Sequence, residues 1–172
     1  MIIYWCKQTE HNIQMEDDIM LYIAYGSNMN IKQMAHRCPK SKKVGLGLLV
    51  GWKLVFNVHA DIIRTDDMND TVPVVLWNIH KDDWKSLDRY EGYPSYYVKE
   101  IVNVLTDSDI VIQAVVYVMA ERRKGIAMPF KEYYNTILQG YVDNGIKLDA
   151  LTNALVYTAY HETEHNQYNP RY

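Results

Sequence analysis

The chain has 172 residues, a formal net charge of −3 and 48% hydrophobic residues. Its length predicts one domain, and its apolar content suffices for a hydrophobic core. The basic runs at 40–43 and 121–124 are short, so we expect no nucleic-acid partner. The longest mostly apolar runs, at 44–52 and 110–120, are too short to cross a membrane, so we expect no membrane partner.

The first residues lack the order of a secretory signal, which is a basic start, an apolar stretch and a small-residue cleavage site. This predicts a cytoplasmic location, in which Cys6 and Cys38 stay reduced thiols. Tyr outnumbers Phe by 15 to 2. Because Tyr combines ring area with a hydroxyl that needs a partner, this excess fits either a polar pocket with aromatic walls or a Tyr-rich surface.

The first part of the chain predicts an extension, a strand, a tight turn and a helix. Residues 1–18 show no clean period, and we expect them to lie outside the fold as an extension that can be disordered. The apolar, β-rich stretch 19–28 predicts a strand that a Gly-Ser-Asn turn ends. Helical spacing of apolar residues predicts a helix over 29–39, with Asn28 or Asn30 as its cap.

The rest of the chain mixes strands and helices without regular alternation. Strands are predicted at 47–63 (one or two), 71–79, 95–105 and 109–120, with a turn at 66–70. Helices are predicted at 80–92, 129–145 and 146–159, followed by a polar tail at 160–172. This order predicts an α+β domain over 19–159 with a mixed or largely antiparallel sheet.

The turn at 25–28, with the sequence YGSN, connects the first predicted strand to a helix. Such a turn can point several backbone N–H groups at one spot, which then binds an anion or an oxyanion. An ordinary strand-to-helix connection is the alternative interpretation. Ser27 could be a nucleophile, but the G-x-S-x-G pattern is absent.

Glu91 lies at the predicted end of a helix, and four tyrosines are its neighbours in sequence: Tyr90, Tyr93, Tyr96 and Tyr97. A carboxylate walled by rings loses hydration, so its pKa should rise, which suits a general acid/base. The alternative is an exposed loop acid beside tyrosines that pack the sheet. Asp88 is one turn earlier, and we expect it to be a helix-surface or supporting group.

The stretch HETEH at 161–165 fits the H-E-x-x-H pattern of zinc proteases, in which His161 and His165 would hold the metal. That pattern needs a helix in a cleft and a third ligand. Here it lies in a polar tail, so a metal-dependent hydrolase is a minor alternative and we expect no metal site.

Three segments, read together, resemble the γ-glutamylcyclotransferase family (AIG2-like, also called BtrG-like). They are YIAYGSN near the start, LDRYEGYPSYY about 60 residues later, and EYYNTILQGYVDNGIKL. The resemblance covers roughly residues 20 to 150. It implies a mixed, mostly antiparallel sheet curled into a small barrel with flanking helices.

The resemblance also implies a reaction. In this family the α-amine of a γ-glutamyl group attacks its own γ-carbonyl, which releases 5-oxoproline and an amine or amino acid. No metal or organic cofactor is used, so we expect none here. The implied partner is a small γ-glutamyl compound, and because some relatives form dimers, a homodimer stays open.

By the same resemblance, Glu91 is the general acid/base. The backbone amides of Gly26, Ser27 and Asn28 would hold a substrate carboxylate or the oxyanion, which stays open. The remaining implied substrate-binding residues are Tyr22, Ile23, Ala24 and Tyr25, which lead into that loop, and the pocket residues Tyr97 and Tyr133.

The segment 58–70 is short where better-known members often carry a Gly-rich loop. The resemblance therefore predicts the reaction better than it predicts the substrate. Free γ-glutamyl amino acids, γ-glutamyl amines, glutathione and γ-glutamyl-protected metabolites all remain open. A non-catalytic module that binds a small ligand on the same fold is the main alternative function.

Overall fold

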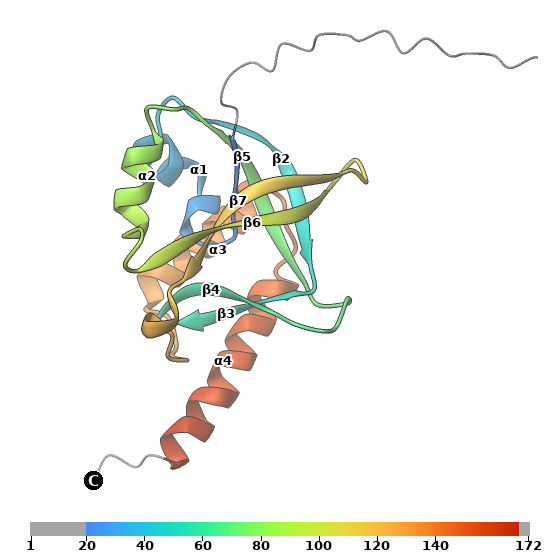
Figure 1. Cartoon of the computed structure of the whole chain (residues 1–172). Coiled ribbons are helices and arrows are strands. Elements are labelled where there is room, and N and C mark those ends of the chain that lie inside the picture. Colours follow the sequence, from blue (N-terminus) through green and yellow to red (C-terminus); the bar gives the residue numbers. More distant parts are fainter. Residues whose placement is uncertain (1–19, 169–172) are drawn as a thin grey trace, which may run out of the picture.

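The computed structural model describes residues 20–168, with side chains through residue 162. Five strands close a barrel in the order β1-β5-β2-β6-β7 (Figure 1). Their bounds are β1 Met20–Ala24, β2 Lys42–Val50, β5 Thr71–Ile79, β6 Tyr97–Thr106 and β7 Val111–Met119. All neighbours are antiparallel except β1 and β7, which pair in parallel. The predicted α+β class and its small, mostly antiparallel barrel are confirmed.

A two-stranded sheet, β3 (Trp52–Asn57) and β4 (His59–Arg64), lies beside the barrel. The prediction of one or two strands over 47–63 was therefore wrong, because β2, β3 and β4 all enter that range. The chain reverses at Gly51 and at Val58, both of which have a positive φ. A β-branched residue rarely adopts that conformation, so Val58 gave no turn signal in the sequence.

The helices largely follow the predicted positions. They are α1 (Ile31–Arg37), α2 (Trp84–Glu91), α3 (Lys131–Asp143) and α4 (Asp149–Tyr168), with short 3₁₀ turns η1 (Ser27–Met29) and η2 (Glu121–Arg123). Asn30 caps α1 by accepting a hydrogen bond from the N–H of Gln33.

The α4 helix passes the predicted end at 159, so part of the expected polar tail is helical. No Gly or Pro interrupts the chain between Asp149 and Tyr168, and Pro170 is the next such residue. The predicted extension at 1–18 lies outside the described residues. No helix within 20–168 is long and apolar enough to cross a membrane.

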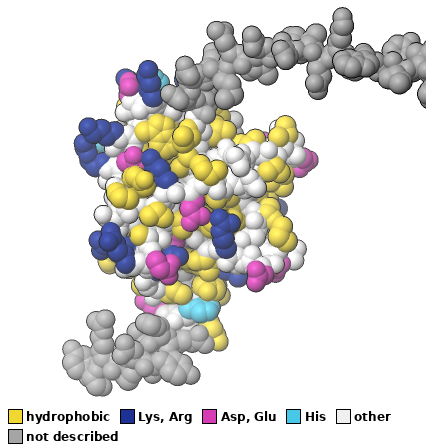
Figure 2. All heavy atoms as spheres, in the orientation of Figure 1, with side chains coloured by type: hydrophobic (Ala, Val, Ile, Leu, Met, Phe, Trp, Pro, Cys, Tyr) yellow, Lys and Arg dark blue, Asp and Glu magenta, His cyan; other side chains and the backbone are white. Residues whose placement is uncertain are grey.

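The core fills the barrel and the space beneath α3 and α4. Ile23, Val74, Val104 and Val116 from four barrel strands are fully buried. Hydrophobic and charged side chains of both signs are interspersed on the face that Figure 2 shows. The α1 and α2 helices lie side by side next to the barrel (Figure 1), and α1 follows directly on the turn η1. Loops and turns that a rigid scaffold positions are common places for functional side chains.

Candidate active site

Glu91 is the last residue of α2, and the helix ends there because Gly92 takes the left-handed conformation with φ 64°. A side chain at position 92 would also collide with Tyr96, since an added Cβ would lie 2.9 Å from the Tyr96 Cβ. The turn therefore directs the chain into β6 with Tyr96 and Tyr97 beside Glu91.

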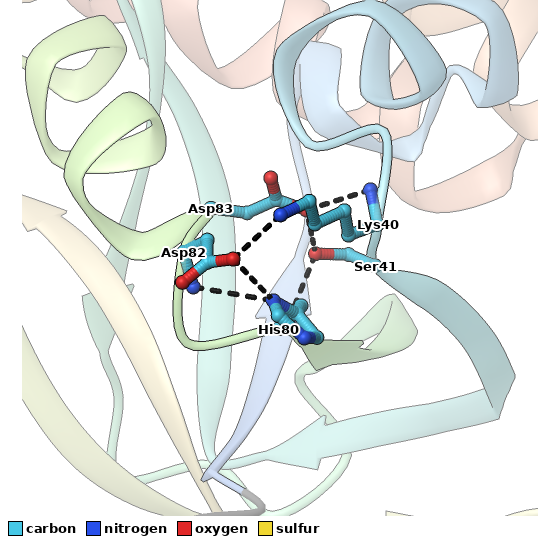
Figure 3. Close-up of polar contacts among 5 residues, drawn as sticks. All are labelled: Lys40, Ser41, His80, Asp82 and Asp83. Carbon is cyan, nitrogen blue, oxygen red and sulfur yellow. Dashed lines mark hydrogen bonds and ion pairs between the residues drawn. The ribbon is translucent and has the colours of Figure 1, made fainter.

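A polar cluster fixes the start of α2 against the loop after α1 (Figure 3). The buried carboxylate of Asp83 accepts hydrogen bonds from Lys40 N at 2.9 Å and Ser41 Oγ at 2.8 Å. Lys40 Nζ also pairs with Asp82 at 2.5 Å. Because α1 and α2 are tied together at this cluster, residues on both helices keep a fixed relation to each other.

The same cluster brings a Ser, a His and an Asp together, but not as a nucleophilic triad. Ser41 Oγ donates to Asp83 and accepts from the backbone N–H of His80, not from its ring. The His80 ring is half-exposed and faces Asp82 at 3.6 Å. A triad requires the imidazole to take the serine proton, so this cluster has a structural role.

The turn η1 is held by α3. Gly140 of α3 meets η1 so closely that an added Cβ would lie 2.8 Å from Met29 Cβ and 2.9 Å from Asn30 N. Asn144 donates from Nδ2 to the carbonyl of Met29 at 2.8 Å. Only glycine permits this approach, which explains why position 140 carries one.

Asn28 connects Glu91 to the rest of the turn. Its Nδ2 donates to Glu91 Oε1 at 2.5 Å and to the hydroxyl of Tyr22 at 2.9 Å. Arg37 donates from Nη1 to Asn28 Oδ1 and, at 3.2 Å, to Ser27 Oγ. Since Arg37 occupies the amide oxygen, the Asn28 amide nitrogen must face Glu91.

Burial raises the pKa of Glu91 from its ordinary value of 4.5 to about 7, although the charge of Arg37 and the hydrogen bond from Asn28 both lower it. Loss of hydration disfavours the charged form, and here that effect exceeds the two opposing ones. A carboxyl group with a pKa near neutrality can both accept and release a proton.

The Ala60 backbone fixes the hydroxyl groups of two tyrosines of the site, one as a hydrogen-bond acceptor and the other as a donor. Ala60 N donates to the hydroxyl of Tyr133 at 3.1 Å, whereas the Tyr97 hydroxyl donates to Ala60 O at 2.7 Å. The proton of Tyr133 is therefore free to point elsewhere, while the proton of Tyr97 is committed. The pair offers one hydrogen-bond donor and one acceptor.

These groups surround a small cavity of about 30 Å³. Eight of the predicted site residues line it: Tyr22, Tyr25, Gly26, Ser27, Asn28, Glu91, Tyr97 and Tyr133. The predicted residues Ile23 and Ala24 do not line it; both are part of the hydrophobic core. A second cavity of about 330 Å³ shares Ser27, Glu91, Tyr97 and Tyr133 with the first.

The model of the gamma-glutamyl cyclotransferase, AIG2-like family matches residues 22–136. The chain belongs to this family. Gamma-glutamylcyclotransferase of Homo sapiens is 29% identical over 145 residues, which cover 78% of this chain and 76% of the relative. The protein of the same name from Bos taurus is 28% identical over the same extent.

Solved structures agree. A gamma-glutamyl cyclotransferase structure superposes with a TM-score of 0.69 at 28% identity, covering 78% of this chain and 85% of the other. YkqA from Bacillus subtilis superposes with a TM-score of 0.62 at 21% identity, covering 84% of this chain and 54% of YkqA, and at that identity it shows the fold alone. The relatives' names describe an enzyme, which supports an enzymatic role for this family member.

The sequence prediction missed several residues around the cavity. Arg37, Ala60 and Tyr117 come from α1, β4 and β7, and no sequence motif connects them to Glu91. Tyr117 accounts for the role of Asp88. The Asp88 carboxylate accepts a hydrogen bond from the Tyr117 hydroxyl at 2.5 Å and pairs with Lys99 at 2.6 Å. Asp88 thus supports a wall of the cavity and does not enter it.

The HETEH stretch is helical, and His161 Nδ1 lies 2.9 Å from the carbonyl of Tyr157, while the side chain of His165 lies outside the described set. Among the described side chains no group of three or more His, Cys, Asp or Glu could hold a metal ion. Cys38 is a free, buried thiol, and burial raises its pKa to about 12, so it stays protonated. Cys6 lies outside the described residues.

Proposed function

We propose that this chain is a γ-glutamyl cyclotransferase that converts a small γ-glutamyl amide into 5-oxoproline and a free amine or amino acid. The observation that carries the proposal is the position of Glu91 beside the cavity together with its raised pKa. Its carboxyl group borders a cavity, has a pKa raised to about 7 and lies in a chain of this family.

Glu91 acts twice in the reaction. In its ionised form it takes a proton from the α-ammonium of the substrate, and the freed amine attacks the γ-carbonyl carbon to form the ring C–N bond. The protonated Glu91 then gives this proton to the departing nitrogen as the original amide C–N bond breaks, and the ring nitrogen loses its second proton to solvent to become the N–H of the product. The amine and the carbonyl belong to one molecule, so their high effective concentration supplies much of the rate.

Two kinds of donor are available for the negative charge that develops on the γ-carbonyl oxygen. The first hydrogen bonds of η1 come from Met29 N and Asn30 N, which leaves the N–H groups of Ser27 and Asn28 without an acceptor inside that turn. The hydroxyl proton of Tyr133 is free as well. We propose that these donors share the oxyanion and the substrate carboxylate.

Tyr25 and Tyr97 have a different role. Their hydroxyl protons are given to the carbonyls of Tyr117 and Ala60, so toward the cavity they can only accept. The N–H groups of the substrate ammonium and of the leaving amine both need hydrogen-bond acceptors, and we propose that these two hydroxyl oxygens supply them. The bonds that form and break lie within the substrate, and the protein has only to move protons and stabilise charge. We therefore propose that no metal or organic cofactor takes part, and that a small γ-glutamyl compound is the partner the site requires.

A panel of γ-glutamyl amino acids, γ-glutamyl amines and glutathione tests the proposal, with 5-oxoproline measured by mass spectrometry and binding by calorimetry. We expect 5-oxoproline from at least one compound. Binding without product across the whole panel would overturn the proposal in favour of a non-catalytic binding module.

A further inference from the structure

The larger cavity next to Glu91 has walls made of rings. Its volume is about 330 Å³, and five aromatic side chains line it: His59, Tyr90, Tyr96, Tyr97 and Tyr133. Of the described residues in its lining, Glu91 alone is an acid, and none is Lys or Arg. Neither His59 nor Tyr96 is among the substrate-binding residues expected from the sequence.

The polar atoms of these rings are mostly engaged with protein groups. His59 Nδ1 lies 2.8 Å from the Tyr96 hydroxyl, and the Tyr90 hydroxyl lies 3.0 Å from Ser27 Oγ. Tyr97 and Tyr133 both bond the Ala60 peptide. The wall therefore offers a ligand ring surface more than it offers hydrogen bonds.

The nearby cations are also engaged by rings. The guanidinium of Arg37 lies 3.4 Å from the centre of the Tyr90 ring, and that of Arg123 lies 5.2 Å from the centre of the Tyr96 ring. Burial lowers the pKa of His59, so its imidazole is neutral at neutral pH. A charged side chain entering this cavity would lose hydration, and among the described residues that line it Glu91 alone could pair with such a charge.

The small cavity is too narrow for a whole substrate. At about 30 Å³ it accepts little more than one polar end of a γ-glutamyl group. The two cavities meet at Glu91, where the scissile amide must lie. The part of the substrate beyond that amide must then extend into the ring-lined cavity.

We propose that the ring-lined cavity is the leaving-group site, that it selects an amine bearing an uncharged aromatic side chain, and that His59 is a residue that sets this preference. The inference rests on the proposed function. The His59 ring meets those of Tyr96 and Tyr133 edge-on, with centroids 5.6 and 5.0 Å away, so it joins the two walls into one aromatic surface. A planar side chain can pack against that surface, whereas an alanine side chain is too short to cover it.

The test compares kcat/KM for 5-oxoproline release from three compounds: γ-glutamyl-phenylalanine, γ-glutamyl-alanine and α-amine-linked γ-glutamyl-lysine. We expect the phenylalanine compound to be preferred over both others by the wild type. His59→Ala should lower the phenylalanine-to-alanine ratio by about 3- to 10-fold, mainly through KM, because one aromatic contact is lost. His59→Phe keeps a ring and should preserve the ratio.

His80→Ala is the matched control, because His80 is a half-exposed histidine away from both cavities, and it should leave the ratio unchanged. Equal kcat/KM for the three compounds, or a ratio that His59→Ala does not alter, would overturn the inference while leaving the proposed function intact. If no compound of any class gives 5-oxoproline, the proposed function fails and the inference fails with it. The ratio is measured within each variant, so partial loss of folded protein does not change it.

Discussion

Two carboxylates, the partly buried Glu91 and the fully buried Asp61, have raised pKa values for the same reason, which is loss of hydration, yet their surroundings differ. Asp61 is fully buried in β4, where Oδ1 accepts from Met119 N at 2.9 Å and Oδ2 accepts from Asn57 Nδ2 at 3.2 Å. Among the described residues Asn28 alone donates a hydrogen bond to Glu91, which borders both cavities.

The comparison separates a structural acid from one that can react. Asp61 joins β4 to β3 and β7, and neither cavity reaches it, so its proton cannot be exchanged with a substrate. Glu91 keeps oxygen lone pairs toward the cavities and has a pKa matched to neutral pH. A raised pKa alone therefore does not identify a catalyst, and access to a cavity distinguishes the two groups.

The largest expected effect is on activity in Glu91→Gln. The amide keeps the shape and can still accept from Asn28, but it cannot take a proton, so kcat/KM should fall by at least about 100-fold. Steady-state rates of 5-oxoproline release measure this change. A Glu91→Gln enzyme with near-normal turnover would remove Glu91 from the mechanism.

Glu91→Gln should lower activity but maintain or raise the stability of the fold above neutral pH. A folded pKa of about 7, above the ordinary 4.5, means that the fold favours the protonated carboxyl. Folding stability therefore falls as pH rises from 4.5 through about 7. Glu91→Gln lacks this penalty, so at pH 8 its melting temperature should equal or exceed that of the wild type.

Tyr133→Phe should have the next largest effect. It removes a hydroxyl whose proton is free to meet the oxyanion, so kcat should fall by at least about tenfold. Tyr141→Phe is a matched control on the same helix, because its hydroxyl is buried and has no hydrogen-bond partner among the described residues. Kinetics should be unchanged in the control, and equal losses in both variants would contradict a specific role for Tyr133.

Asp61→Asn should mainly lower stability, whereas Glu91→Gln should mainly lower activity. One oxygen becomes an N–H₂ group that faces an N–H donor in the core, so the free energy of unfolding should fall by about 1–3 kcal/mol. Chemical denaturation measures this loss. Activity per folded molecule should fall less than tenfold, and an Asp61→Asn protein that is fully stable but inactive would contradict the division between the two acids.

Much of the fold could be predicted from the sequence because its signals are local. The strand 71–79 and the end of α2 at Gly92 follow directly from an apolar run and a helix-ending glycine. Val58 could not be recognised as a turn, since its positive φ is imposed by pairing between β3 and β4. The extent of α4 beyond 159 was missed because polar composition was taken to mean the absence of a helix.

The residues of the site also fall into those with a local sequence signal and those without one. Glu91 and the loop 26–28 are continuous motifs, so the sequence could indicate them. Packing of α1 brings Arg37 to Asn28, and packing of the β3–β4 hairpin brings Ala60 and His59 to the cavities. Such packing leaves no local pattern in the sequence. The direction of each tyrosine proton likewise depends on which backbone group lies opposite the hydroxyl.

The pH dependence of kcat/KM for 5-oxoproline release by the wild-type enzyme tests the central claim most directly. Glu91 must be ionised to accept the ammonium proton, so the rate should rise with pH along an acid limb whose pKa is about 7. A profile without any acid-limb pKa above about 5, close to the ordinary value of a glutamate, would contradict the account that burial tunes Glu91 for this reaction.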